Sequence, residues 1–291
     1  QNTALDAPTA RASTSRMLAA VGGSATEELS TGDVKKAFLK GTEYGAGEPQ
    51  RYTKYRAYKG APWRVFRLRK SLYGSADAPM RWYQRLKEWL DTKGFKPSEE
   101  DCCLFSNATT GARLTTHVDD ILLRAEPAVT EKFWHEINKD LGLKGWGYIR
   151  PGQPRRHCGS NWSAEDRNGA RWYSIDQEAD IKEFLMQEGY HGGRHVASPM
   201  QNNKEMHSDP TLLVGAEKKK FASLKGSLQW FANQTRWDIA FPVARLGQQG
   251  GQLRVPSCVG EPAHRKGKED QNFRCPRFFG SCHGDPFERR D

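Results

Sequence analysis

Two adjacent aspartates, Asp119 and Asp120, interrupt an apolar, β-like run that reads TTHVDDILL from Thr115 to Leu123. The flanking residues predict two strands joined at the acids, which is a β-hairpin with a carboxylate pair at its apex. Like charges this close repel each other unless a cation compensates them, and a divalent metal ion would do so. An ordinary solvated turn is the alternative, because aspartate is common in turns.

A third carboxylate strengthens the metal interpretation. Asp33 ends the β-like start of STGDVKKAFLKG, which continues as a helical turn, and a strand beside the hairpin would bring this acid to the pair. Mg²⁺ binds through a few carboxylates and keeps the rest of its shell for water and phosphate oxygens. Two such ions about 3.5–4 Å apart can activate an attacking oxygen and stabilise a leaving one, which is phosphoryl-transfer chemistry. The acids alone leave a polymerase and a nuclease both open.

The segments around these acids alternate between strand-like and helix-like patterns, which predicts an α+β protein. The segment ADAPMRWYQRLKEWLDTKGF predicts a helix that Asp77 caps and that stops at Gly94. Its apolar residues recur at helical spacing and favour core packing over base stacking. This stripe consists of Tyr83, Leu86 and Leu90, flanked by Trp82 and Trp89.

Further elements are expected on both sides of the acids. In WRVFRLRKSLYG, Phe66 and Leu68 alternate with Arg67 and Arg69, which predicts a half-buried strand with a basic face. Pro151 and Gly152 predict the turn of a hairpin. Helices are predicted in SRMLAAVGG, EKFWHEINKDLG, DQEADIKEFLMQEGY and EKKKFASLKGSLQWFANQTRWDIAFPVARL, the last with breaks at Gly226 and near Arg236–Trp237.

The chain is basic, since its 291 residues carry a formal charge of +10. A basic balance favours a polyanionic partner, above all nucleic acid. Six scattered cysteines without a C-x-x-C pair indicate reduced thiols rather than a zinc site or a disulfide scaffold. No stretch approaches the roughly 20 apolar residues of a membrane span, so we expect a soluble protein that is not secreted.

Four blocks of the chain, in order and with fitting spacing, resemble the reverse transcriptase of copia-type retrotransposons. The blocks are DVKKAFLKG, FRLRKSLYGSADAPMRWYQRLKEWLDTKGF, HVDDILL and GSLQWFANQTRWDIAFPVARL. The resemblance covers about residues 13–246. It implies an RNA-directed DNA polymerase on a palm with a ferredoxin-like antiparallel sheet and helices, together with partial fingers and thumb. It also implies that the sequence is a partial copy of a Pol polyprotein.

By matched position, the resemblance implies which residues hold the metals and the nucleotide. Asp33 and Asp119 would be the main ligands of two Mg²⁺ (or Mn²⁺) ions, and Asp120 would complete the acidic set. Phe38 would lie under the sugar of the incoming deoxynucleotide and disfavour a 2′-hydroxyl. The residues expected beside the nucleotide and template are Tyr73 and Gly74.

The resemblance also suggests where nucleic acid is held. Arg67, Arg69 and Lys70 would meet backbone phosphates, a contact that does not read sequence. Gly159 matches the glycine of the family's primer-gripping hairpin. The expected partners are an RNA or DNA template with its primer, deoxynucleotides and other parts of a Pol polyprotein, with no membrane.

The sequence departs from the family pattern at several points. His117 stands where the family has Tyr, and Trp237 replaces a Pro. The segment Ser75-Ala76-Asp77 replaces a Leu-x-Gln stretch. The basic fingers strand and the ribonuclease H motifs of the family are not found, which suggests a decayed copy of the element.

These observations predict four regions. Residues 1–25 are expected to be a fingers remnant, 26–150 a palm with the catalytic hairpin, and 151–246 a primer-grip and thumb-connection region. Residues 247–291, rich in Gly and Pro, are expected to be a disordered tail outside the family.

The leading hypothesis is a reverse transcriptase that acts in a cytoplasmic virus-like particle or in the nucleus. A remnant that only binds nucleic acid and a two-metal nuclease are the alternatives.

Overall fold

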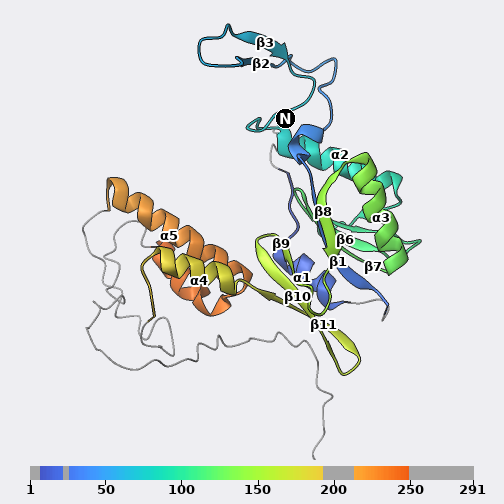
Figure 1. The fold of residues 1–291 in the computed structure, drawn as a ribbon, viewed down its shortest axis with the longest axis vertical. Coiled ribbons are helices and arrows are strands. Elements are labelled where there is room, and N and C mark those ends of the chain that lie inside the picture. The colour runs from blue at the N-terminus through green and yellow to red at the C-terminus, as the bar shows by residue number, and fades with distance from the viewer. Residues whose placement is uncertain (1–6, 22–25, 193–212, 249–291) are drawn as a thin grey trace, which may run out of the picture. The chain divides into compact units, whose positions relative to one another are not determined.

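A computed structural model describes residues 7–21, 26–192 and 213–248 of the chain. It separates into two compact units, residues 1–176 and 177–291, which are described here one at a time. Figure 1 labels their elements. The candidate acids all lie in the first unit.

A six-stranded antiparallel sheet forms the centre of the first unit (Figure 1). The predicted acidic hairpin provides two adjacent strands, and the strand that carries Asp33 pairs with the second of them. In spatial order the strands are β4 (Lys96–Pro97), β5 (Leu104–Ser106), β6 (Arg113–His117), β7 (Asp120–Ala125), β1 (Glu28–Val34) and β8 (Leu143–Tyr148).

Strand β7 lies between two hydrophobic cores, because its side chains alternate between the faces of the sheet. Ile121 and Leu123 pack into the core made with helices α2 (Ala78–Thr92) and α3 (Pro127–Asp140). Leu122 packs on the opposite face with Leu18 of helix α1 (Ala12–Ala20). Burial on both faces explains why this strand has a continuous apolar run.

A second, three-stranded sheet completes the unit on the α1 side. Its order is β11 (Ala170–Asp176), β10 (Ser160–Arg167) and β9 (Arg155–His157). Trp162 of β10 belongs to the same buried cluster as Leu122. The predicted turn at Pro151–Gly152 is present, with Gly152 at φ +74°. Arg150 and Gln153 pair across it in a single antiparallel bridge. The pairing extends no further, since β8 and β9 belong to different sheets.

Helix α2 follows the prediction with two corrections. Asp77 occupies the N-cap position without a capping hydrogen bond, because its carboxylate binds Arg81 at 2.8 Å instead. The buried stripe is centred on Trp82 and Trp89, whereas Tyr83 is only partly buried. The expectation that these aromatic residues pack in the core is confirmed.

The strand predicted in WRVFRLRKSLYG is present, but the prediction that it is half-buried is wrong. Strand β3 (Arg64–Arg67) pairs only with β2 (Tyr52–Tyr55), and both form a separate two-stranded ribbon. Phe66 is 48% exposed, because no other layer in the described part of the chain covers the ribbon on either side. Figure 1 shows the ribbon extending away from the sheet of its unit.

The second unit is helical where it is described. Helix α4 (Glu178–Gln187) was predicted, as was the long helix α5 (Gly215–Gln234). Helix α5 runs through Gly226, so the predicted break there is wrong. The second predicted break is confirmed, since the 3₁₀ turn Trp237–Ile239 separates α5 from α6 (Ala240–Gln248). Phe184 and Phe231 pack edge to face, with ring centroids 5.4 Å apart.

The structure confirms a mixed α+β protein with antiparallel sheets. The predicted assignment of palm, fingers and thumb stays a prediction, and most of the expected tail lies outside the described residues. No helix in the described ranges combines the length and the apolar character needed to cross a membrane.

Candidate active site

The three candidate carboxylates are brought together by strand pairing. Asp33 and Asp120 are directly opposite Cα partners on the antiparallel strands β1 and β7. Asp119 lies in the two-residue turn between His117 and Asp120, which are paired across β6 and β7. The backbone N–H of Val34 donates to the carbonyl of Asp119 over 2.9 Å and fixes this turn against β1. The predicted convergence of the three acids is therefore present.

A strained residue shapes the turn before Asp119. Val118 has φ +59°, a conformation that a β-branched residue rarely adopts. The indole N–H of Trp82 donates to the Val118 carbonyl over 2.7 Å, and Trp82 itself is fully buried in helix α2. Helix α2 thus holds the turn in a conformation that the turn residue alone would not favour.

The folded state disfavours the charged forms of the two hairpin aspartates, Asp119 and Asp120. Burial, followed by the negative charge of Asp33, raises the pKa of Asp119. Burial also raises the pKa of Asp120, and the charges of Asp119 and Asp33 add to this shift. The raised pKa values of both aspartates indicate that the site has too little positive charge to balance its carboxylates.

Lys144 supplies part of that positive charge. Its Nζ lies 2.7 Å from Asp33 Oδ2 and 3.8 Å from Asp119 Oδ2. The residue sits at an irregularity in the β1–β8 ladder, where Asp33 pairs with Gly145 and Val34 pairs with Leu143. Such a bulge inserts an extra residue and redirects its side chain. The ammonium thus stands beside two carboxylates at the position where a cation is electrostatically favoured.

The ligand types of the three acids suit a divalent cation, but the structure does not bring one oxygen of each acid within 4.8 Å of the others. Asp33 Oδ1 is buried and has no hydrogen-bond partner, which leaves a lone-pair donor beside the acid pair. The three residues offer carboxylate oxygens only, the ligands that Mg²⁺ and Mn²⁺ prefer. Asp33, Asp119 and Asp120 are therefore the residues that could hold such ions.

A pocket opens next to Asp33 and Asp120, with a volume of about 470 Å³. Two walls of opposite character enclose it. One wall comes from the six-stranded sheet: β1 contributes Asp33, β7 contributes Asp120, and β1 and β8 contribute three glycine positions. The other wall comes from strand β9 and the turn after it, which contribute the cations. The lining residues of this second wall are Arg155, Arg156, Cys158 and Gly159.

The turn between β9 and β10 reaches the acids directly. Cys158 and Gly159 have φ of +47° and +72°, the pattern of a tight two-residue hairpin turn. The backbone N–H of Cys158 lowers the pKa of Asp120, against the larger opposite effect of burial. Gly159, matched by sequence to the primer-gripping hairpin, therefore lies in the same pocket as two of the candidate ligands.

Gly147 provides room for one of the pocket cations. A Cβ at position 147 would overlap the guanidinium of Arg155. The guanidinium of Arg155 therefore rests directly on the backbone of strand β8, and its Nε points to the Tyr148 carbonyl at 3.5 Å. The close approach keeps this cation at the wall of the pocket.

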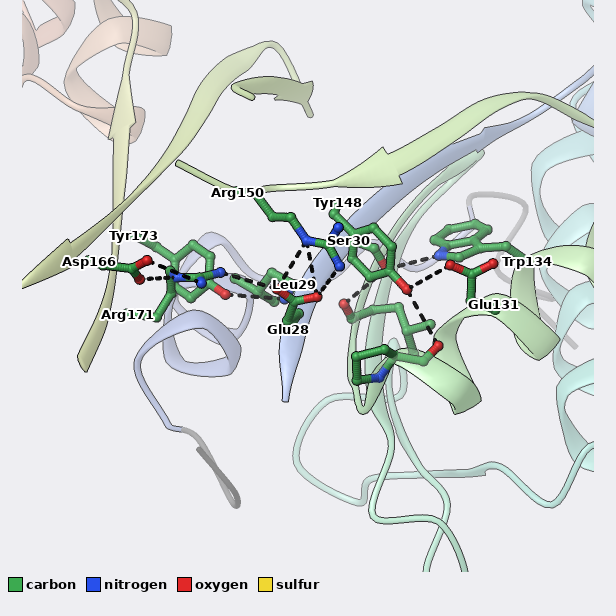
Figure 2. Close-up of polar contacts among 12 residues, drawn as sticks. Glu28, Leu29, Ser30, Glu131, Trp134, Tyr148, Arg150, Asp166, Arg171 and Tyr173 are labelled. Carbon is green, nitrogen blue, oxygen red and sulfur yellow. Dashed lines mark hydrogen bonds and ion pairs between the residues drawn. The ribbon is translucent and has the colours of Figure 1, made fainter. Parts of the chain in front are cut away.

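An ionic network fixes the second wall to the end of β1 opposite Asp33 (Figure 2). The Glu28 carboxylate accepts from Arg150 at 3.0 Å and from Arg171 of β11 at 3.3 Å. Nearby, the Tyr173 hydroxyl accepts from the Leu29 N–H at 3.2 Å. Figure 2 shows these contacts joining β1 to the three-stranded sheet. Because both walls are tied to β1, the pocket has a defined width.

The predicted nucleotide-contact residues also lie close together. The rings of Phe38 and Tyr73 meet edge to face, with centroids 5.7 Å apart. Phe38 belongs to the 3₁₀ turn Ala37–Lys40 and packs on the same core as Val118, which precedes Asp119. Gly74 has φ +87°, so the turn after Tyr73 needs a glycine.

His117 is partly buried at the family's Tyr position. Both of its ring nitrogens are buried and lack a hydrogen-bond partner. A buried polar group without a partner costs stability, which makes this departure from the family pattern unfavourable in the fold.

Sequence reasoning missed Lys144 and the pocket cations Arg155 and Arg156. No local pattern marks them, since their positions depend on the bulge in β8 and on the placement of a second sheet. Among the described residues, Asp101, Cys102 and Cys103 form a group of potential ligands whose atoms all lie within 4.8 Å of one another. Asp101 also accepts from Thr14 Oγ1 at 2.6 Å and thereby anchors helix α1.

Comparison with known proteins identifies the family. Residues 2–151 match the family model described as reverse transcriptase (RNA-dependent DNA polymerase). The chain is 28% identical over 223 residues to the retrovirus-related Pol polyprotein from transposon RE2 of Arabidopsis thaliana, which covers 74% of the chain and 14% of that protein. It is 25% identical over 248 residues to the Pol polyprotein from transposon TNT 1-94 of Nicotiana tabacum, covering 81% of the chain and 18% of that protein.

A shorter relative is the putative transposon Ty5-1 protein of Saccharomyces cerevisiae, 23% identical over 205 residues. That match covers 67% of the chain and 60% of the yeast protein. No solved structure matches the chain. The chain spans less than a fifth of the plant polyproteins, and the resemblance to copia-type elements is confirmed. On this evidence the chain belongs to the reverse transcriptase family.

Proposed function

We propose that the first unit carries the palm of a reverse transcriptase that extends a primer 3′ end with deoxynucleotides on an RNA or DNA template. The observation that carries the proposal is the meeting of Asp33, Asp119 and Asp120 at the ends of paired strands, with Asp33 Oδ1 unpartnered. Such a donor set suits two divalent ions, which when bound would polarise the attacking and leaving oxygens.

The order of elements supports a palm. Along the chain, β1 is followed by α2, the β6–β7 hairpin, α3 and β8, and the strands lie side by side as β6, β7, β1 and β8. This is the β-α-β-β-α-β pattern of a ferredoxin-like sheet. We propose that residues 26–150 form this palm, that residues 1–25 belong to fingers, and that residues 151–246 lead into a thumb.

The pocket suits the end of a nucleic-acid strand. The chain's own acids lie on one wall, and Arg155 and Arg156 lie on the other. Guanidinium groups would hold a phosphodiester of the primer by charge-assisted hydrogen bonds. The carboxylates would then face the primer's terminal sugar, where a 3′ hydroxyl needs to be placed and its proton removed.

Phe38 and Tyr73 would form the floor for the incoming nucleotide. Their edge-to-face contact gives a rigid aromatic surface next to the core under the Val118 turn. A ring at this place would exclude a 2′-hydroxyl by contact, which supports deoxynucleotides as substrates.

Primer extension tests the proposal. The full chain would be given a labelled DNA primer on an RNA template, deoxynucleotides and Mg²⁺ or Mn²⁺. We expect extension by the unchanged chain and a loss of at least about 100-fold in Asp119→Asn, since a ligand charge is removed at the reacting atoms. Asp91→Asn is the matched control, because Asp91 is an exposed acid of helix α2 that pairs with Lys96.

Equal product from the unchanged chain and Asp119→Asn would refute the catalytic role. Salt-sensitive binding without any extension would instead support the second candidate function, a decayed remnant that only holds nucleic acid. The observation that favours this second candidate is His117, whose unpartnered ring stands beside the acids in place of the family's Tyr.

A further inference from the structure

A carboxylate and two thiols meet in the turn that precedes strand β5. Asp101, Cys102 and Cys103 each offer one ligand atom, and these three atoms all lie within 4.8 Å of one another. Two sulfur ligands of one tetrahedral Zn²⁺ ion, each about 2.3 Å from the metal, are roughly 3.8 Å apart. The three side chains therefore need only small movements to share one ion.

This ligand group differs in chemistry and exposure from the catalytic acids. Thiolate sulfur is a ligand that Zn²⁺ accepts and that Mg²⁺ does not favour. Cys102 is exposed and Asp101 is partly buried, whereas Cys103 lies in the protein interior with 0% exposure. An ion from solvent can therefore reach the group through Cys102 and Asp101.

Neighbouring elements hold the backbone of this turn in place. The Tyr83 hydroxyl of α2 donates to the Cys102 carbonyl over 2.9 Å, and the Thr116 N–H of β6 donates to the Cys103 carbonyl over 3.0 Å. Both bonds use main-chain oxygens of the cysteines. Coordination of an ion by the two sulfur atoms therefore breaks neither of them.

Asp101 keeps room for a metal ion beside its structural contacts. Its carboxylate accepts from Thr14 Oγ1 at 2.6 Å and from the N–H groups of Arg11 at 3.1 Å and Cys103 at 3.0 Å. An ionised carboxylate offers about four lone-pair positions, so one is left for an ion. Carboxylates that bind metals are usually hydrogen-bonded in this way, which fixes their orientation.

From this arrangement we propose that Asp101, Cys102 and Cys103 bind one Zn²⁺ ion, with water at a fourth position. On binding, the two thiols release their protons to solvent and two zinc–sulfur bonds form. The chain has no C-x-x-C pair, the spacing from which a zinc site is usually predicted, but in this turn adjacent thiols lie close enough to share an ion.

The ion has a structural role. It binds at a turn that already contacts α1 through Asp101, α2 through Cys102 and β6 through Cys103. Because the ion binds the folded turn, it stabilises the fold around these contacts. The site goes beyond primer extension, since Asp33, Asp119 and Asp120 take no part in it.

Co²⁺ binding to the full chain in excess Mg²⁺ tests the proposal. Thiolate-to-cobalt absorption reports sulfur ligands directly, and Mg²⁺ occupies sites that offer oxygen alone. We expect the unchanged chain to show this absorption and Zn²⁺ to remove it by displacing Co²⁺. Cys102→Ser, at an exposed position, should weaken binding at least about 100-fold, since loss of even an outer contact of a metal site costs about 10–100-fold.

The matched control replaces the four other cysteines by serine and should keep the absorption. These residues are Cys158, Cys258, Cys275 and Cys282. Asp101→Asn should weaken Co²⁺ binding about tenfold or more while the thiolate absorption remains at saturation.

Thermal unfolding gives a second readout. Zn²⁺ at about 100 times its dissociation constant should raise the unfolding midpoint of the unchanged chain by about 5–10 °C. Cys102→Ser should lose this shift. Asp33→Asn and Asp119→Asn should keep it, which separates the proposal from the catalytic one.

Equal Co²⁺ affinity of Cys102→Ser and the unchanged chain would overturn the proposal. Loss of the absorption in the variant that keeps only Cys102 and Cys103 would do the same, because it assigns the ion to the other thiols. Unchanged affinity in Asp101→Asn would remove the carboxylate from the ligand set and refute the three-residue site.

Discussion

Lys144 reaches Asp33 through a bulge in the strand next to it, and its Nζ lies 2.7 Å from Asp33 Oδ2. The same ammonium is 3.8 Å from Asp119 Oδ2. The contact with Asp33 raises the pKa of Lys144, so the side chain stays charged at neutral pH. The lysine therefore competes with any other cation for these two carboxylates.

Replacing Lys144 should strengthen metal binding. In Lys144→Gln the carboxylates lose a competing charge, and we expect the Mn²⁺ dissociation constant, measured by electron paramagnetic resonance, to fall severalfold. Lys139→Gln serves as the control, since Lys139 is an exposed lysine of helix α3. Weaker Mn²⁺ binding in Lys144→Gln would mean that the lysine supports the metal site rather than competing with it.

The acidic hairpin should be destabilising when no metal is bound. Burial and the charges of Asp119 and Asp33 raise the pKa of Asp120. The folded state thus binds the Asp120 proton more readily than the unfolded chain does, and the charged form costs stability at neutral pH. Asp120→Asn should raise the unfolding midpoint in EDTA by about 2–4 °C, the shift that about 1 kcal/mol produces in a domain of this size.

Asp101→Asn should have the opposite effect. Burial opposes its charge, but hydrogen bonds from Thr14 Oγ1 and the backbone N–H groups of Cys103 and Arg11 hold the pKa of Asp101 below its usual value. Asp101→Asn should therefore lower the unfolding midpoint in thermal melts. A drop in both variants would show that the charge of Asp120 is compensated in the fold.

His157 should make the fold sensitive to mild acid. Its ring is 2% exposed, Nδ1 lies 2.9 Å from Thr31 Oγ1, and burial, with a smaller effect of His117, lowers the pKa of His157 to about 4. Below about pH 6.5 the unfolded chain takes up a proton that the folded state does not, so stability falls as the pH falls. The loss should reach about 3 kcal/mol near pH 4.

Urea titrations between pH 7.5 and pH 4 measure this loss. His157→Gln should flatten the part of the pH profile that lies below pH 6.5, even if the variant is less stable at neutral pH. His135→Gln, at an exposed position of helix α3, is the control and should keep the full slope. The same slope in His157→Gln and the unchanged chain would rule out this histidine as the cause.

The acid site could be predicted because its signals are local. Asp119 and Asp120 break a strand pattern at one point, and a single pairing of β1 with β7 is enough to add Asp33. Lys144 could not be predicted in the same way. Its direction depends on a register shift that arises only when β8 pairs with β1, and no residue pattern near Lys144 signals that shift.

For the β2–β3 ribbon, the local sequence pattern predicted a half-buried strand, and the predicted burial is absent from the structure. Alternation of Phe66 and Arg67 is typical of a strand with one covered face. Strand pairing followed that pattern, but burial requires another layer, and none of the described elements covers β2 and β3. Helix α2 was predictable in extent, whereas the partner of Asp77 was not, because Arg81 competes for the carboxylate one turn later.

Gly32, next to Asp33, should be intolerant of even a methyl group. A Cβ at Gly32 would lie 2.6 Å from Trp134 Cζ3 and 2.8 Å from Trp146 Cβ. These two indoles stack at 12°, and Trp134 is fixed by its N–H bond to Ser30 Oγ at 2.9 Å. Since neither ring can move without breaking a contact, Gly32→Ala should cost about 1–3 kcal/mol.

Gly145→Ala is the matched control for this substitution. Gly145 is the neighbour of Asp33 in the same sheet, lines the same pocket, and a Cβ there would meet nothing within 4 Å. Urea unfolding should therefore separate the two variants, with Gly145→Ala within about 0.5 kcal/mol of the unchanged chain. Equal stability of both variants would mean that the stacked rings of Trp134 and Trp146 can move to accommodate the added methyl group. In that case the strand that carries Asp33 would be less rigidly held than these contacts indicate.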